Sequence, residues 1–340
     1  MSVSSSVAEP GRDWYQFGDG CLGVVSEDLP FRDRFRLIFS ECRLEAEPDP
    51  GRPSVTCRVQ CPSASRLSLV SFEDPEALDA LGFVLTVFPD RGYRDISGTG
   101  SPWRVLGVES AAGEMSIAFE GNCAAAESTA QWQPIIANLA VNRVLRLQRD
   151  VLFFHAASVA VAGRGALICG PKGAGKTTLS MSLAARGHAF LGEELAAVRL
   201  STRQLLPFRR AVSIRPGPGS EQVQRLLQER PDLPRERYPD GGVRVRVPMG
   251  ELFPDARAIE APLSDAFFLR GFTEQARVET FTPGSQHLQL ISPLRSTAWG
   301  MPRGLLTVRL LKLLSGVRCH FLDAGDPEAT ADLVQGILEG

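Results

Sequence analysis

Gly170-Pro171-Lys172-Gly173-Ala174-Gly175-Lys176-Thr177 is the stretch on which the fold and the function of this chain depend. It fills every fixed position of the pattern G-x-x-x-x-G-K-[ST]. Glycines at these positions allow successive backbone N–H groups to turn toward phosphate oxygens, and the start of a helix adds its partial positive charge. The stretch therefore predicts a loop that binds the phosphates of a nucleotide.

The residues on either side of this loop have the pattern that such a loop requires. Residues 166–169 are apolar and predict a strand that enters the loop. Residues 177–186 predict a helix that leaves it, with Leu179 and Leu183 on one face and Gly187 at its end. The alternative is a glycine-rich turn that binds nothing, and the combination of strand, loop and helix argues against it.

Individual roles within the loop follow from the motif. Lys176 would reach the β- and γ-phosphates of the nucleotide and take part in catalysis, and the Thr177 hydroxyl would bind Mg²⁺. The residues predicted to contact the nucleotide are Gly170, Pro171, Lys172, Gly173, Ala174, Gly175, Lys176, Thr177 and Thr178.

The bulk composition is that of an ordinary globular protein. A length of 340 residues favours two domains. The net charge of −2 gives no reason to expect a nucleic-acid or membrane partner. No apolar run reaches the ~18 residues that a membrane span needs, and the first residues lack the pattern of a signal peptide. We therefore expect a cytoplasmic protein.

Cysteine and lysine usage add two expectations. The seven cysteines are scattered, which favours a reducing compartment and free thiols. Cys57 and Cys61 share one face of a predicted strand, where core or surface thiols are favoured over a zinc site. The only lysines are Lys172, Lys176 and Lys312. Together with abundant Ala, Pro and Gly, this preference for arginine is typical of a GC-rich bacterial genome.

The chain divides by pattern into three parts. Residues 1–125 predict a mostly β, or α+β, module without a chemical motif, which serves either as a docking module for a substrate or partner or as a scaffold. Residues 126–150 predict a connecting helix, and residues 151–340 the nucleotide-binding domain. In the first part we expect a short helix at 74–81 and strands at 35–39, 54–59, 67–72, 82–88, 103–108 and 115–119.

The segment before the phosphate loop predicts a hairpin. Residues 151–162 are apolar and carry His155, and Gly163-Arg164-Gly165 turns them into the strand that enters the loop. A helical crossover would be expected at this place in a parallel sheet. After the loop helix, residues 189–191 predict a short strand that ends in Glu193 and Glu194.

The remainder alternates between breakers and short elements. Residues 203–246 are rich in arginine and are expected to be loop-like. Arg209, Arg210 and Arg215 are candidates for binding an acidic peptide or the transferring phosphate. The alternative is that these arginines only form a solvated face. Further predictions are paired strands at 263–270 and 277–281, a helix at 303–315, a strand at 319–322 and a helix capped by Asp326 that ends near residue 338.

The two adjacent acids lie close to the loop in sequence. Glu193 and Glu194 follow Lys176 by 17 and 18 positions. One helix and one strand fill this interval, so the chain returns to the phosphate-loop end of the sheet by the shortest route. The alternative is a pair of solvated acids that open a surface loop.

The order of these motifs resembles a known family. His155, the glycine turn at 163–165, the phosphate loop, Arg186-Gly187-His188 and the acid pair resemble the catalytic domain of HPr kinase/phosphorylase and its HPr-kinase-related serine kinase relatives, over residues 155–194. The resemblance implies a compact α/β domain related to the nucleotide-binding core of phosphoenolpyruvate carboxykinase. It does not imply a doubly wound parallel sheet.

The resemblance also implies an activity. It implies an ATP- and Mg²⁺-dependent kinase in which Glu193 holds the metal ion and Glu194 accepts the proton of the substrate hydroxyl. It further implies a catalytic role for His155, which would lie near the pair and tune it or the γ-phosphate. The family usually has Asp-Asp where this chain has Glu-Glu, and its signature for recognising the HPr protein is not visible here. The predicted acceptor is therefore a serine of another peptide or small protein.

Two alternatives remain open at this point. The acceptor could be a small molecule such as a free amino acid. The chain could also be a non-catalytic, ATP-binding regulatory or docking protein. The longer Glu side chains displace each carboxylate by a bond length, and a shift of ~1 Å can cost ~100-fold in rate. The resemblance allows a homo-oligomer as well, since members of this family assemble in that way.

Overall fold

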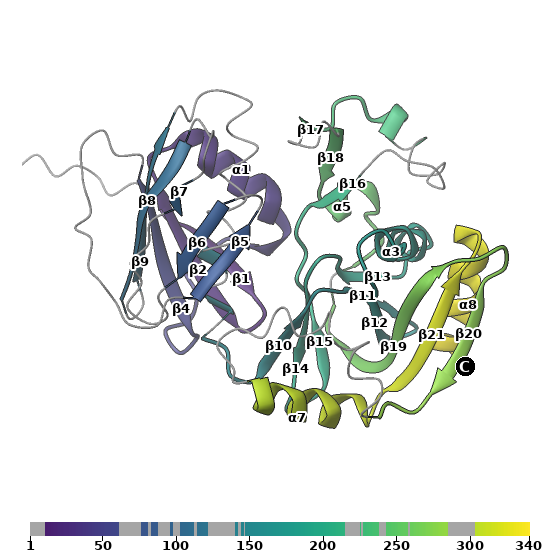
Figure 1. Cartoon of the computed structure of the whole chain (residues 1–340). Helices are drawn as coiled ribbons and strands as arrows, with labels where there is room; N and C mark the ends of the chain where they lie inside the picture. Colours follow the sequence, from purple (N-terminus) through teal and green to yellow (C-terminus); the bar gives the residue numbers. More distant parts are fainter. Residues whose placement is uncertain are drawn as a thin grey trace, which may run out of the picture. The chain divides into compact units, whose positions relative to one another are not determined.

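The structure is a computed structural model that describes residues 11–60, 76–80, 83–87, 96–97, 103–111, 114–121, 140–141, 144–145, 147–214, 225, 227–237, 243–257, 259–284 and 303–340. The chain forms two compact units (Figure 1). The N-terminal unit comprises Met1–Gln16, Gly20–Arg36 and Arg43–Leu147. The C-terminal unit comprises Phe17–Asp19, Leu37–Cys42 and Gln148–Gly340, so it includes two short segments from early in the chain.

A sheet with the strand order β3-β1-β2-β4-β9-β8-β7-β6-β5 is the core of the N-terminal unit. β2 pairs with β4 and β4 with β9 in parallel, whereas β5 to β9 pair as antiparallel neighbours. The strands are β1 (Asp13–Phe17), β2 (Gly20–Ser26), β3 (Arg43–Leu44), β4 (Ser54–Gln60), β5 (Glu76–Ala80), β6 (Phe83–Val87), β7 (Ile96–Ser97), β8 (Trp103–Ala111) and β9 (Glu114–Gly121).

Helix α1 (Leu29–Phe39) corrects one sequence prediction, because residues 35–39 were expected to form a strand. The Asp28 carboxylate accepts a hydrogen bond from the backbone N–H of Phe31 at 2.8 Å, which caps the start of the helix. Phe31 and Phe35 then lie one turn apart, and the ring of Phe35 contacts that of Tyr15 at 4.8 Å between centroids. This four-residue spacing of aromatic rings outweighs the local strand propensity.

Strand β5 corrects a second prediction. Residues 74–81 were expected to be helical, yet Glu76–Ala80 pairs in antiparallel register with β6. Pairing with a neighbouring strand decides the conformation of such a short segment, since strand preference depends strongly on context. The predictions near 54–59, 82–88, 103–108 and 115–119 are confirmed, β1 and β2 were missed, and the predicted strand at 67–72 lies outside the described residues.

Asp13 is the charged centre of the N-terminal unit and carries a testable prediction. Its side chain is buried and accepts hydrogen bonds from Arg36 at 3.1 Å and from Arg43 at 3.1 Å, with Arg32 at 3.4 Å. Burial alone would raise the pKa of Asp13, but the hydrogen bond from Arg36 and the three positive charges outweigh it, so the pKa lies below the usual 3.8. We expect Asp13→Asn to lower the free energy of unfolding at pH 7 by about 1.5–3 kcal/mol.

The pH dependence of this effect follows from the direction of the shift. Because the pKa of Asp13 is lower in the folded protein, its stabilisation is complete above the unfolded pKa and is lost as the pH falls through the folded pKa. The difference between wild type and Asp13→Asn, measured by urea unfolding, should persist from pH 7 to about pH 4 and shrink below it. Asp33→Asn, an exposed acid 3.8 Å from Arg36, is the matched control. Equal losses in both variants would contradict the prediction.

The C-terminal unit is built on a mixed sheet with the strand order β10-β14-β15-β19-β12-β11-β13, and β21 lies between β19 and β20. β19 runs parallel to both β12 and β21, and the other pairs are antiparallel. The strands are β10 (Val151–Phe154), β11 (Ala157–Val161), β12 (Arg164–Cys169), β13 (Ala189–Gly192), β14 (Ala196–Arg199), β15 (Gln204–Leu206), β19 (Ala261–Phe272), β20 (Arg277–Phe281) and β21 (Arg318–Ala324). The predicted mixed α/β class is what the structure shows.

Helices cover both faces of this sheet (Figure 1). α3 (Lys176–Ala185) and α8 (Pro327–Glu339) pack through Leu179 and Val334 against Ile168 and Phe267 on one face. On the other face, α7 (Arg303–Leu314) buries apolar side chains such as Leu310 against the alternate strand residues. This division follows from the strand period of two, which sends neighbouring side chains to opposite faces.

The hairpin before the phosphate loop is present as predicted. β11 pairs with β12 in antiparallel register from Ala157 opposite Ile168 to Val161 opposite Arg164. Ala162 and Gly163 form the turn with positive φ values of 49° and 79°. β13 also pairs antiparallel to β11, so β12 and β13 run in the same direction and their carboxyl ends lie at the same edge of the sheet.

Two other predictions for this unit are wrong. β19 and β20 were expected to pair with each other, but β21 lies between them and pairs with both. The arginine-rich segment was expected to be loop-like, but it contains β16 (Val212–Ile214), β17 (Arg235–Arg237) and β18 (Val243–Val247) in a three-stranded sheet, followed by the short helix α5 (Met249–Leu252). In β18, Val245 and Val247 are buried whereas Val243 is exposed. Pairing of β18 with β16 and β17, which composition does not record, decides the conformation of this segment.

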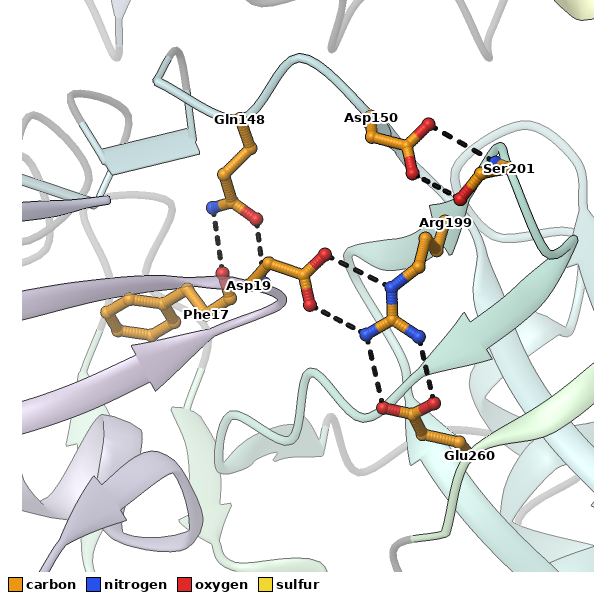
Figure 2. Close-up of polar contacts among 7 residues, drawn as sticks. All are labelled: Phe17, Asp19, Gln148, Asp150, Arg199, Ser201 and Glu260. Atoms are coloured by element: carbon orange, nitrogen blue, oxygen red, sulfur yellow. Dashed lines mark hydrogen bonds and ion pairs between the residues drawn. The ribbon is translucent and has the colours of Figure 1, made fainter. Parts of the chain in front are cut away.

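The segment Phe17–Asp19 is bound within the C-terminal unit by polar contacts (Figure 2). The Gln148 amide donates to the carbonyl oxygen of Phe17 at 2.8 Å and accepts from the backbone N–H of Asp19 at 2.8 Å. Arg199 binds the carboxylates of Asp19 and Glu260 with both sides of its guanidinium group. Within the part of the chain that the structure describes, no helix is long and apolar enough to cross a membrane.

Candidate functional site

The phosphate loop joins β12 to α3 in a backbone conformation that requires its glycines. Gly173 and Gly175 have φ values of 87° and 98°, in the left-handed region that favours glycine. At Gly170 a Cβ atom would lie 3.0 Å from the Cβ of Leu269, so the loop also packs closely on the neighbouring strand. Gly175 caps α3 without a side-chain hydrogen bond. The first N–H groups of the helix are therefore not occupied by a capping side chain and can bind an anion.

Lys176 is the best-buried charge of the loop. Its side chain is 9% exposed, and its Nζ donates to the carbonyl oxygens of Gly170 at 2.8 Å and Pro171 at 3.1 Å. Burial lowers the pKa of Lys176 from its usual value, while nearby Cys169, Glu193 and Glu194 act in the opposite direction. The ammonium group is thus held across the loop, where phosphate oxygens would be bound.

Thr177 and Glu193 meet at the same edge of the sheet. Glu193 directly follows β13, and its Oε1 accepts a hydrogen bond from the Thr177 hydroxyl at the start of α3. Burial raises the pKa of Glu193, and the hydrogen bond from Thr177 opposes this rise. Mg²⁺ prefers oxygen ligands and uses one or two carboxylates together with substrate phosphates. The hydroxyl and carboxylate oxygens therefore fit a Mg²⁺ site. Among the described residues, no group of three or more His, Cys, Asp and Glu side chains is arranged to hold a metal ion.

Glu194 lies beside positive charges. Its carboxylate pairs with Arg210 at 2.7 Å, and its carbonyl oxygen accepts a hydrogen bond from His155 Nδ1 at 3.1 Å. The charge of Arg210 lowers the pKa of Glu194, and Arg246, His155 and Arg244 add to this. The carboxylate is consequently an anion at neutral pH, on a side chain that is 49% exposed.

These side chains line a single pocket of about 560 Å³. The loop contributes Lys172, Gly173, Gly175, Lys176, Thr177 and Thr178. His155, Glu193 and Glu194 also line the pocket, whereas Gly170, Pro171 and Ala174 belong to the loop but do not line it. The structure thus brings together most of the site residues that the sequence predicted.

The three arginine candidates have different places. Arg210 pairs with Glu194 at the pocket, but Arg209 is buried and bonds Glu41 at 2.7 Å and the carbonyl oxygen of Ala256 at 2.9 Å. The suggested phosphate-binding role of Arg209 is therefore wrong, because its guanidinium group bonds other residues of the protein. Arg215 lies outside the described residues.

Sequence reasoning did not single out five further residues that line the pocket, namely Met181, Ser213, Ile214, Arg244 and Phe272. Met181 lies on the loop helix, where its spacing from Thr177 and Thr178 could have indicated it. Arg244 lies in the arginine-rich segment 203–246, whose composition could have indicated it. Ser213, Ile214 and Phe272 lie on strands far along the chain, and no local signal marks them.

Comparison with known proteins adds little to this geometry. No protein-family model matches the sequence. No curated protein matches it either. Among solved structures it is similar to the HPr(Ser) kinase/phosphatase from Coxiella burnetii, with 13% sequence identity and a TM-score of 0.28, over 55% of this chain and 88% of that chain. This similarity is weak, and the functional conclusion rests on the pocket.

Proposed function

We propose that the C-terminal unit binds ATP with Mg²⁺ and transfers the γ-phosphate to a hydroxyl group, with a serine of a peptide or small protein as the acceptor. A distant relationship to HPr-kinase-like proteins, with a nucleotide-binding core like that of phosphoenolpyruvate carboxykinase, is part of this proposal. The observation that carries it is the convergence of Lys176, the Thr177–Glu193 pair and Glu194 in one pocket at the phosphate loop.

The loop side of the pocket would bind the nucleotide. Backbone N–H groups at the start of α3 and the Lys176 ammonium would contact the phosphates, and Thr177 with Glu193 would hold Mg²⁺. When bound, the metal ion would neutralise charge on the β- and γ-phosphates. Phosphoryl transfer requires chiefly this positioning and charge stabilisation, which the described residues are placed to supply.

Glu194 would act on the acceptor. In the transfer, the bond from the γ-phosphorus to the bridging oxygen breaks and a bond to the acceptor oxygen forms, while the hydroxyl proton passes to a carboxylate. Glu194 is the acid adjacent to Glu193 in the pocket; Arg210 pairs with its carboxylate, and His155 bonds its backbone carbonyl oxygen. We assign the role of proton acceptor to Glu194 on this geometry.

One observation favours a second candidate, an ATP-binding docking protein without transfer. The pairing with Arg210 lowers the pKa of Glu194 and so weakens it as a base. In such a protein the same loop would bind ATP, and the bound nucleotide would regulate an interaction with a partner. The two candidates differ in turnover and not in nucleotide binding.

The test combines calorimetry with transfer of labelled γ-phosphate to serine-containing peptides and hydroxyl metabolites. We expect wild type to bind ATP with Mg²⁺ and to label an acceptor, and Glu194→Gln to bind ATP while transferring about 10²–10⁴-fold more slowly. Glu339→Gln, an exposed acid of α8, is the control. Binding without labelling of any acceptor would favour the docking protein, and unchanged transfer by Glu194→Gln would remove its assigned role.

A further inference from the structure

Phe272 is an exposed aromatic ring at the pocket. Its side chain is 64% exposed. The other large hydrophobic residues that are exposed in the described part of the chain are all aliphatic. Phe272 also lines the pocket together with the phosphate loop. An apolar ring of this size in water is unfavourable unless another group covers it. Its place therefore points to a ligand and not to the protein core.

The strand that carries Phe272 extends past the phosphate loop. β12 and β19 are parallel, with Cys169 opposite Phe268, and β12 ends there while β19 continues to Phe272. The Cζ atom of the Phe272 ring lies 3.2 Å from the position that a Cβ on Gly175 would take. The ring thus rests against the loop one residue before Lys176.

A bulge in β19 turns the ring toward this face. Leu269 lies opposite Leu322 and Phe272 opposite Ala324, so β19 has one residue more than β21 over this interval. In a regular strand, positions three apart face opposite sides of the sheet. The extra residue returns Phe272 to the face of Leu269, on which α3 and the loop pack. Gly271 adopts a φ of 155° in this bulge, a conformation that side chains rarely allow.

We propose that Phe272 is the platform on which the base of the bound nucleotide stacks. The proposal rests on the proposed function, since the phosphates would first have to bind the loop beside the ring. Every nucleobase has a flat π face, and stacking on an aromatic side chain contributes to affinity whatever the base. Gly173 lines the same pocket and leaves open space there, because a Cβ on it would meet no atom within 4 Å.

The test separates the contribution of the base to binding affinity from that of the phosphates. Calorimetry with Mg²⁺ compares ATP with inorganic tripolyphosphate, which has the phosphates and no base. We expect wild type to bind ATP more tightly than tripolyphosphate. In Phe272→Ala the affinity for ATP should fall about ten- to hundredfold, whereas that for tripolyphosphate stays within about twofold. Phe272→Trp should retain ATP affinity and show a fluorescence change with ATP that tripolyphosphate does not cause.

Val308→Ala removes an equally exposed apolar side chain on α7, outside the pocket, and should bind both ligands as wild type does. An unchanged ATP affinity in Phe272→Ala overturns the inference. Equal losses for ATP and tripolyphosphate overturn it as well, because the ring would then support only the loop. If wild type binds ATP and tripolyphosphate equally, the stacking role of Phe272 is wrong and the proposed function stands. If wild type binds neither ligand, both the stacking role and the proposed function are wrong.

Discussion

Replacing Lys176 with alanine is expected to abolish detectable phosphate transfer and to weaken ATP binding, with a combined loss of about 10²–10³-fold or more. The physical reason is the position of its Nζ, which is buried and bound to the carbonyl oxygens of Gly170 and Pro171 at the loop. A buried charge in a preorganised place interacts with phosphate more strongly than one in water. Calorimetry and transfer of labelled γ-phosphate would measure the two parts of the effect.

Lys172→Ala is the matched control for this prediction. Lys172 lies in the same loop and lines the same pocket, but its side chain is exposed and occupies a variable position of the motif. Removing it takes away the same formal charge, with an expected change of a few-fold that added salt reduces. If the two lysine variants lose the same activity, the loop acts only through its net charge. Full activity of Lys176→Ala would refute the proposed role of the loop.

Replacing Asp265 with alanine is expected to lower the free energy of unfolding by about 3–5 kcal/mol. Asp265 is fully buried in β19, accepts hydrogen bonds from His320 Nε2 at 2.8 Å and from Arg318 Nη2 at 3.0 Å, and pairs with Arg164 at 3.5 Å. Removal of the carboxylate would leave these donors next to the sheet without their acceptor. The same strand carries Phe272, so the loss would also affect the wall of the pocket.

Urea unfolding measures this loss, and ATP affinity under native conditions separates stability from function. Asp332→Ala is the control, because Asp332 pairs with Arg186 at 2.8 Å but has a side chain that is 73% exposed. Its expected cost is below about 1 kcal/mol. If Asp265→Ala does not fold, Asp265→Asn keeps the shape and should show a smaller loss in the same direction. Similar losses in the free energy of unfolding for Asp265→Ala and Asp332→Ala would contradict the prediction, because burial of the carboxylate would then make no difference.

Elements governed by neighbouring residues could be predicted from the sequence. The hairpin β11–β12 follows from two apolar runs around a glycine turn. Helix α8 follows from Asp326, which accepts from the N–H groups of Glu328 and Ala329 at 3.0 and 3.1 Å, and from Pro327 in the first turn. Local hydrogen bonds and fixed backbone angles decide these elements, so a short window of sequence contains the necessary information.

Elements decided by distant neighbours were missed. β20 joins the sheet through β21, about 40 residues further along the chain, and not through β19, which precedes it directly. α1 was mistaken for a strand because its aromatic spacing suits both structures until a partner surface is known. Pairing across a sheet depends on contacts between segments far apart in the chain, which propensity does not record.

The phosphate loop and the short path from Lys176 to Glu193 and Glu194 were determined by the sequence alone, since one helix and one strand return the chain to the same edge. The tertiary structure alone decided which other residues line the pocket or contact the residues that do. Arg210 pairs with Glu194, while Arg209 turns away to Glu41. Phe272 reaches the loop because β19 lies parallel to β12 and contains a bulge. Such placement depends on strand register and side-chain direction, which only the folded chain specifies.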